Sequence, residues 1–177
     1  MTKIWPRLEL HAWNTLPSLI VLLLALMCLL PKYLSGLGQF MPMLPLIPIF
    51  FWAMYESRDI PYWVAFLIGF LMDAISGQPL GLSSLMNLLF MVVAHAQRKY
   101  IHKEGFVIQW GYFALIAASY QLAIWGVLSL FIGQWLGFGS AFFQWLLTVC
   151  VYPPLHKLFE RVNAYLHHRR WELIRSM

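Results

Sequence analysis

No charged residue interrupts the stretch GFVIQWGYFALIAASYQLAIWGVLSLFIGQWLGFGSAFFQWLLTVCVYPPL, which covers residues 105–155. A membrane-spanning helix needs about 20 largely apolar residues to cross about 30 Å of hydrocarbon, so this stretch is long enough for two crossings. Glycines gather at residues 133–139, where the chain would turn between the two helices. The stretch therefore predicts a pair of membrane-spanning helices.

The composition of the whole chain agrees with this class. Of its 177 residues, 61% are apolar and only 11% are charged, whereas a soluble domain carries about 25% charged residues. The net charge of +5 would suit a nucleic acid. However, the basic residues lie between apolar segments and in the C-terminal tail, where anionic lipid headgroups explain them better. We therefore expect one membrane-embedded domain that binds no nucleic acid.

Three more apolar stretches precede residues 105–155, and the longest of them is cut by the turn-forming cluster Ser76-Gly77-Gln78-Pro79. We expect an all-α polytopic membrane protein, a compact bundle with six spans near residues 14–31, 40–56, 60–75, 80–97, 106–131 and 138–159. Residues 1–177 would form a single transmembrane domain, made of an interfacial segment (1–13), the six-span bundle (14–159) and a basic amphipathic tail (160–177). Three prolines, Pro42, Pro45 and Pro48, predict an irregular start to the second span.

The basic residues predict the orientation. If the N-terminus lies in the cytoplasm, every Lys and Arg except Lys32 falls on a cytoplasmic segment. Because Lys and Arg favour cytoplasmic loops, we expect both termini inside. In the C-terminal tail an apolar stripe runs beside basic residues, so the tail would rest on anionic lipid through Arg161, Arg169 and Arg170.

Asp73 is the only acidic residue between Asp59 and Glu104, and it lies at the end of an unusually short span. A lone charge at membrane depth is costly and is usually buried toward the interior of a bundle or a polar cavity. Alternatively, Asp73 caps the Ser76–Gly81 turn or faces water at the outer leaflet. The hairpin from Asp73 to Gly81 could dip into the membrane wherever protein or water satisfies its backbone.

The sequence contains no convincing catalytic constellation. An intramembrane aspartyl hydrolase needs two carboxylates that share a site, and only Asp73 lies at membrane depth. We expect His95 on the opposite membrane face from Asp73, and both His95 and His156 near headgroups rather than on a metal. The sequence thus predicts a protein that is not an enzyme, with no cofactor and no metal.

The segment GFLMDAISGQPLG (residues 69–81) resembles the signature of the rod shape-determining protein MreD family, in which a Gly is followed by an Asp one turn later and then by a small-residue turn. The length of the chain, its six-span layout and the aromatic end of span two, Phe50-Phe51-Trp52, are also similar. The family often carries a polar residue beside the proline that opens span two, whereas Met41 and Met43 flank Pro42 here.

The resemblance implies a non-catalytic scaffold of the cell-wall elongation machinery in the bacterial inner membrane. Its implied partners are the periplasmic scaffold MreC, the cytoskeletal filament MreB, and the glycan polymerase RodA with its transpeptidase. As interface or core elements we single out the hairpin residues Gly69, Asp73, Gly77, Pro79 and Gly81. The alternative is a substrate-binding subunit of an energy-coupling-factor-type transporter, whose polar cavity would use Asp73, Gln78, Asn87 and Gln134.

Overall fold

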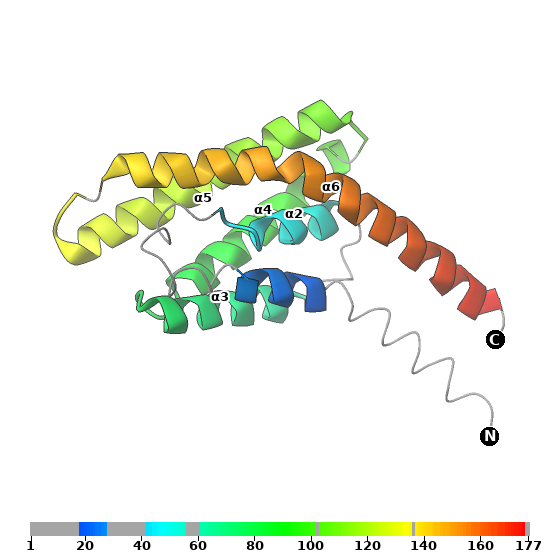
Figure 1. The fold of residues 1–177 in the computed structure, drawn as a ribbon, viewed down its shortest axis with the longest axis horizontal. Coiled ribbons are helices and arrows are strands. Elements are labelled where there is room, and N and C mark those ends of the chain that lie inside the picture. Colours follow the sequence, from blue (N-terminus) through cyan, green and yellow to red (C-terminus); the bar gives the residue numbers. More distant parts are fainter. Residues whose placement is uncertain (1–17, 28–41, 56–60, 102, 136, 176–177) are drawn as a thin grey trace, which may run out of the picture.

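The computed structural model describes residues 18–27, 42–55, 61–101, 103–135 and 137–175, and in these ranges it contains helices and no strand (Figure 1). The helices are Ser18–Met27, α2 (Leu46–Tyr55), α3 (Tyr62–Ser76), α4 (Leu82–Ile101), α5 (Phe106–Ile132) and α6 (Phe138–Arg175). The prediction of an all-α protein is confirmed, and each predicted span overlaps one helix. The predicted interfacial segment at residues 1–13 lies outside the described residues.

Two of these helices are long and apolar enough to cross a membrane, Phe106–Ile132 and Phe138–Tyr165. They lie largely in the stretch of residues 105–155 for which the sequence predicts two crossings. The apolar helices Ser18–Met27, Leu46–Tyr55 and Tyr62–Ser76 are shorter, and α4 carries Arg98 and Lys99 in its last turn. The number of spans therefore stays a prediction.

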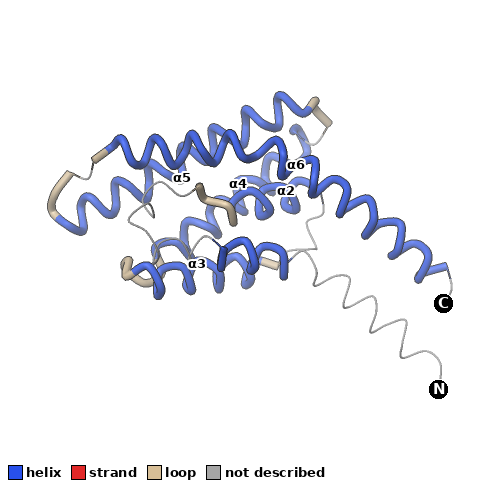
Figure 2. The backbone as a smooth tube through the Cα atoms, viewed as in Figure 1, coloured by secondary structure: helices blue, strands red, loops and turns tan. Residues whose placement is uncertain are grey.

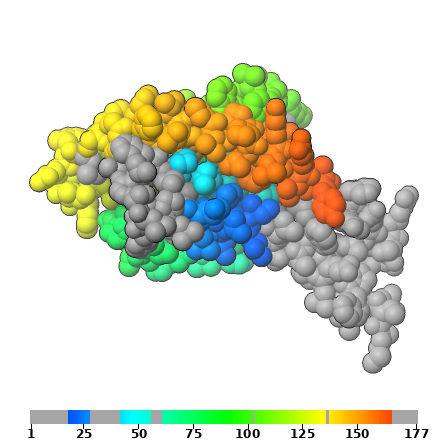
Figure 3. All heavy atoms as spheres, viewed as in Figure 1, coloured from blue at the N-terminus to red at the C-terminus, as the bar shows by residue number. Residues whose placement is uncertain are grey.

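Helix α2 forms the centre of the molecule. Its residues from Leu46 to Met54 are all buried, and it packs against α4 and α6. In the space-filling view only a small cyan area, from the segment of residues 42–55, is visible between Ser18–Met27 and α6 (Figure 3). Pro42 and Pro45 precede the helix, while Pro48 lies in its first turn, where a missing N–H costs no helical hydrogen bond. The irregular start predicted for this segment is present.

Contacts between helix ends place the basic residues of α4 at one end of the bundle. Arg98 Nη2 donates to the Tyr55 carbonyl oxygen at 2.6 Å, and Tyr62 Oη lies 3.5 Å from His95 Nδ1. The last turns of α2 and α4 and the first turn of α3 therefore meet at this end, which we call the basic end. It also carries Lys99, Lys103, Lys157 and Arg161.

The opposite end, the turn end, holds the α3–α4 and α5–α6 turns, drawn in tan in Figure 2. Their sequences, GQPLG at residues 77–81 and GQWLG at residues 133–137, contain no charged residue. The uneven distribution of charge along the sequence thus becomes a difference between the two ends of the folded molecule: the basic end carries Lys and Arg, and the two turns at the turn end carry no charge.

Candidate functional site

The side chain of Asp73 joins α3 to α4. Asp73 lies in the last turn of α3 and has no exposed surface. Its Oδ2 accepts the backbone N–H of Gly81 at 2.9 Å and that of Ser83 at 3.0 Å. These N–H groups open α4 and would otherwise have no partner within the helix. The carboxylate therefore caps α4 and lies at the positive end of its dipole.

The backbone of the same residue closes α3. The Asp73 carbonyl oxygen accepts the N–H of Gly77 and that of Gln78, the latter at 3.3 Å. This double closure requires a left-handed residue at the helix end, and Gly77 has a φ of 66°. Asp73 thus ends one helix with its main chain and starts the next with its side chain.

Gly69 lets the two helices approach each other closely. A Cβ atom built at Gly69 would lie 2.5 Å from the Ser84 Cα and N atoms and 2.7 Å from the Ser83 carbonyl carbon. These are backbone atoms, so no side-chain rotation could relieve the overlap. Gly69 is one turn before Asp73, and the close approach holds α4 where the carboxylate can cap it.

The structure brings the five hairpin residues of the sequence prediction into one unit. Gly69, Asp73 and Gly77 act as described above, the Pro79 carbonyl oxygen accepts the Leu82 N–H at 3.2 Å, and Gly81 has a φ of 98°. Of the alternatives for Asp73, the water-facing one is wrong because the side chain is fully buried. The Asp73 side chain is therefore both buried and a helix cap. It caps the start of α4 rather than the Ser76–Gly81 turn alone.

A second polar link extends from the hairpin into the bundle. The Asn87 amide donates to the Ala65 carbonyl oxygen at 3.4 Å and accepts the Tyr120 hydroxyl at 3.0 Å. Asn87 is buried, so these bonds join α3, α4 and α5 through a group that could not be left unpaired in hydrocarbon.

Helices α5 and α6 are joined by reciprocal tryptophan bonds. The Trp110 indole N–H donates to the Val149 carbonyl oxygen at 3.0 Å, and the Trp145 indole N–H donates to the Ala114 carbonyl oxygen at 2.9 Å. The Val149 carbonyl needs an outside donor because Pro153, four residues later in α6, has no N–H. Trp110 supplies the donor that the proline removes.

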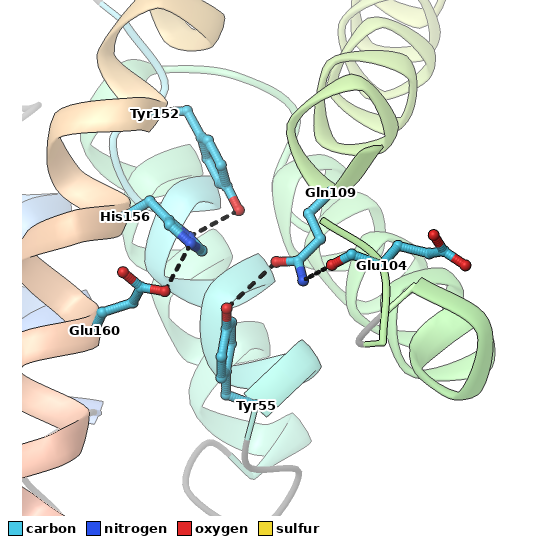
Figure 4. Close-up of polar contacts among 6 residues, drawn as sticks. All are labelled: Tyr55, Glu104, Gln109, Tyr152, His156 and Glu160. Atoms are coloured by element: carbon cyan, nitrogen blue, oxygen red, sulfur yellow. Dashed lines mark hydrogen bonds and ion pairs between the residues drawn. The ribbon is translucent and has the colours of Figure 1, made fainter. Parts of the chain in front are cut away.

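At the basic end, His156 lies in a cluster of polar and aromatic side chains from α2, α5 and α6 (Figure 4). Its Nε2 is 3.4 Å from Glu160 Oε1, and its Nδ1 is 3.2 Å from the Tyr152 hydroxyl. The rings of Phe51 and Phe106 lie against the imidazole, with centroids 5.3 and 5.0 Å away. Beside this group, the Tyr55 hydroxyl donates to Gln109 Oε1 at 3.4 Å.

His156 lies at the basic end, but it is buried among protein side chains, and its predicted position near the headgroups stays a prediction. Two signals in the sequence could have found this arrangement. Glu160 stands one helical turn after His156, and Tyr152 stands one turn before it. The aromatic partners from α2 and α5 have no such signal, because their proximity depends on the packing of separate helices.

The remaining predicted residues do not join one site. Asp73 and Asn87, two of the four transporter-type candidates, are held in the internal bonds described above, and Gln134 is exposed at the α5–α6 turn. Arg161 is exposed on α6, whereas the side chains of Arg169 and Arg170 lie outside the described part.

The residues of the α3–α4 hairpin hold helices together and do not form a group of reactive side chains. His95 pairs with the first residue of α3, whereas Asp73 lies in its last turn, about 16 Å further along the helix. Among the described residues, no three His, Cys, Asp or Glu side chains are grouped so as to hold a metal ion.

Comparison with known proteins gives one match. The sequence model of the family described as rod shape-determining protein MreD matches residues 9–162 of the 177. This range contains the five helices from Ser18–Met27 to α5 completely, and it contains α6 as far as residue 162. No curated protein and no solved structure matches the chain.

Proposed function

Because the chain belongs to the family of the rod shape-determining protein MreD, we propose that it is a non-catalytic scaffold of the machinery that elongates the cell wall. Involvement in rod-shape determination follows from the family. The scaffold role is our proposal, and the observation that carries it is a family match that takes in both helical hairpins and the central helix α2.

We propose that the protein crosses the bacterial inner membrane six times with both termini in the cytoplasm. The separation of the basic end from the uncharged turn end supports this orientation, because Lys and Arg are retained on the cytoplasmic side. Helices α3 and α4 extend less far toward the turn end than α5 and α6 do (Figure 1). The α3–α4 turn would then lie within the outer half of the membrane, which is the position predicted for a hairpin that dips into the membrane.

The partners proposed are MreC, MreB, and RodA with its transpeptidase. A single span of MreC would pack against the outer faces of α3 and α4, where Phe66, Phe70, Leu85 and Leu89 are exposed. The filament MreB would meet the basic end. In this proposal the hairpin of Gly69, Asp73, Gly77, Pro79 and Gly81 sets the angle between α3 and α4, and so shapes the face that a partner span would contact.

The experiment that tests this function is depletion of the protein in its rod-shaped host, with imaging and affinity purification from a tagged strain. Rounded cells, and recovery of MreC with the tagged protein, are expected. Normal rods from which an ATPase-linked membrane partner is recovered instead would refute the scaffold and favour the transporter subunit.

Complementation of the depleted strain tests the hairpin. Asp73→Ala and Gly77→Leu should each reduce both rod shape and recovery of MreC. Gly105→Leu is the matched control for the second change, because Gly105 has an ordinary φ of −64° and open space around it. If both hairpin variants restore rods and recover MreC as wild type does, the hairpin has no part in the function.

A further inference from the structure

Helix α6 is longer than a membrane is thick. Its 38 residues from Phe138 to Arg175 would extend about 57 Å, against about 30 Å of hydrocarbon. The sequence analysis expected a span ending near residue 159 and a separate tail, whereas the helix continues without a break to Arg175. We call residues 155–175, which follow Pro154, the α6 extension.

The backbone of α6 is weakest where the extension begins. Pro153 and Pro154 remove the N–H donors for the carbonyls of Val149 and Cys150, one turn earlier. Helices bend most easily where such bonds are missing, and Figure 1 shows that the C-terminal part of α6 runs in a different direction from the part that lies along α5. Trp110 of α5 binds the Val149 carbonyl, which holds α6 before the prolines. The direction of the extension therefore depends on contacts beyond them.

Aromatic packing joins the extension to α2. Phe159 is buried, and the centroid of its ring lies 5.1 Å from that of Trp52 and 5.7 Å from that of Phe51. Apolar contact is non-directional. This packing alone therefore tolerates small changes in the direction of the extension.

Two polar atoms beside this contact are buried and have no hydrogen-bond partner within the described ranges. One is Trp52 Nε1, a donor on α2, and the other is Asn163 Oδ1, an acceptor on the extension. Trp52 has no exposed surface, and Asn163 follows Phe159 by four residues, which places both on one side of α6. Because a buried polar group without a partner is costly, this donor and this acceptor would each gain from meeting the other.

We propose that the α6 extension has a second, closed position in which the Trp52 indole N–H donates to Asn163 Oδ1. A small change in the bend at Pro153 and Pro154 would bring the amide to α2 while Phe159 keeps its packing. The structure then shows the open position, in which the two groups are apart. The prolines would act as the hinge, and the hydrogen bond would hold the closed position. The last helix would thus leave the basic end in two directions.

The distance between two spin labels on full-length protein in nanodiscs tests the proposal. After Cys28 and Cys150 have been changed to Ser, labels are attached to Val107→Cys, an exposed position in the first turn of α5, and to Glu172→Cys, roughly 25 Å beyond the hinge. Two distances are expected, one for each position of the extension. Asn163→Leu should lower the ratio of closed to open extension roughly fivefold, which is the effect of losing one hydrogen bond.

Three further variants connect the two positions to this bond. Trp52→Phe should lower the ratio by a similar factor, and combining it with Asn163→Leu should lower it no further, because both changes remove the same interaction. Asn163→Asp keeps an acceptor oxygen and should retain the closed position. Trp135→Phe is the matched control for the tryptophan change, since Trp135 is exposed at the turn end, and it should leave the ratio unchanged.

Two results would overturn the proposal. A single distance that Asn163→Leu does not alter would show that the extension has only one position. Two distances whose ratio responds to neither Asn163→Leu nor Trp52→Phe would show a motion that this bond does not control. Because the assay contains no partner protein, either result leaves the depletion experiment on rod shape undecided, and the two proposals fail separately.

Discussion

The carboxylate of Asp73, in the last turn of α3, accepts the backbone N–H of Ser83, in the first turn of α4, at 3.0 Å. The two residues are ten positions apart, and the turn between them contains no charged side chain. A buried carboxylate is tolerated here because backbone donors and a helix dipole receive it. Its role is to fix the geometry of the α3–α4 hairpin.

Asp73→Ala should lower the free energy of unfolding by about 2 kcal/mol, because two backbone N–H groups at the start of α4 lose their acceptor. Asp73→Asn keeps one acceptor oxygen and should lose about half as much. The measurement is thermal unfolding in detergent micelles, where 1 kcal/mol corresponds to a shift of about 2–4 °C at this size. Ala74→Ser, at the exposed neighbour, should change little. Equal midpoints for Asp73→Ala and wild type would rule out the cap.

Gly69→Ala should lower the free energy of unfolding by about 2 kcal/mol, because the new methyl group overlaps the backbone of Ser84. Gly111→Ala is the control, since Gly111 is also within a helix but has no atom within 4 Å of its Cβ position. That change should be neutral or stabilising. The same unfolding assay compares the pair, and equal responses would mean that α3 and α4 do not cross at Gly69.

Trp110→Phe should cost about 1–2 kcal/mol of unfolding free energy, because the Val149 carbonyl loses its donor. In a Pro153→Ala background the cost should largely disappear, since the new N–H at position 153 can bind the Val149 carbonyl within α6. A double-mutant cycle over these four proteins measures the coupling directly. Additive effects would show that Trp110 does not compensate for the proline. The exposed Trp135 provides the control substitution to Phe.

His156→Ala should be the more severe change in its cluster, at about 3 kcal/mol, because it removes a buried ring among aromatic neighbours and leaves the Tyr152 hydroxyl without its partner. Glu160→Gln should cost less than about 1 kcal/mol, since the Glu160 side chain is 52% exposed. Unfolding of the two variants side by side checks the order. A larger effect for Glu160→Gln would make the ion pair, rather than ring packing, the main contribution.

Much of the fold was predictable because hydrocarbon leaves few choices. A backbone that meets no water must bond within its own helix, so the charge-free stretches and the turn clusters at residues 76–79 and 133–139 predict where helices lie. Gly69 and Asp73 were also identifiable, since a glycine and a lone acid one turn apart stand out in an apolar segment. Their family resemblance agrees with the match over residues 9–162.

The sequence by itself determined the helical class, the positions of the helices and the gathering of basic residues between alternate segments. Only the tertiary structure decided that Asp73 binds the start of α4, that Trp110 supplies the donor missing at Pro153, and that His156 is buried among rings from other helices. The reason is physical. Helix formation depends on local bonds and on polarity along the chain, whereas these pairings depend on how far each helix rotates about its axis and how closely it approaches its neighbour. Contacts such as that of Gly69 with Ser84 set both quantities.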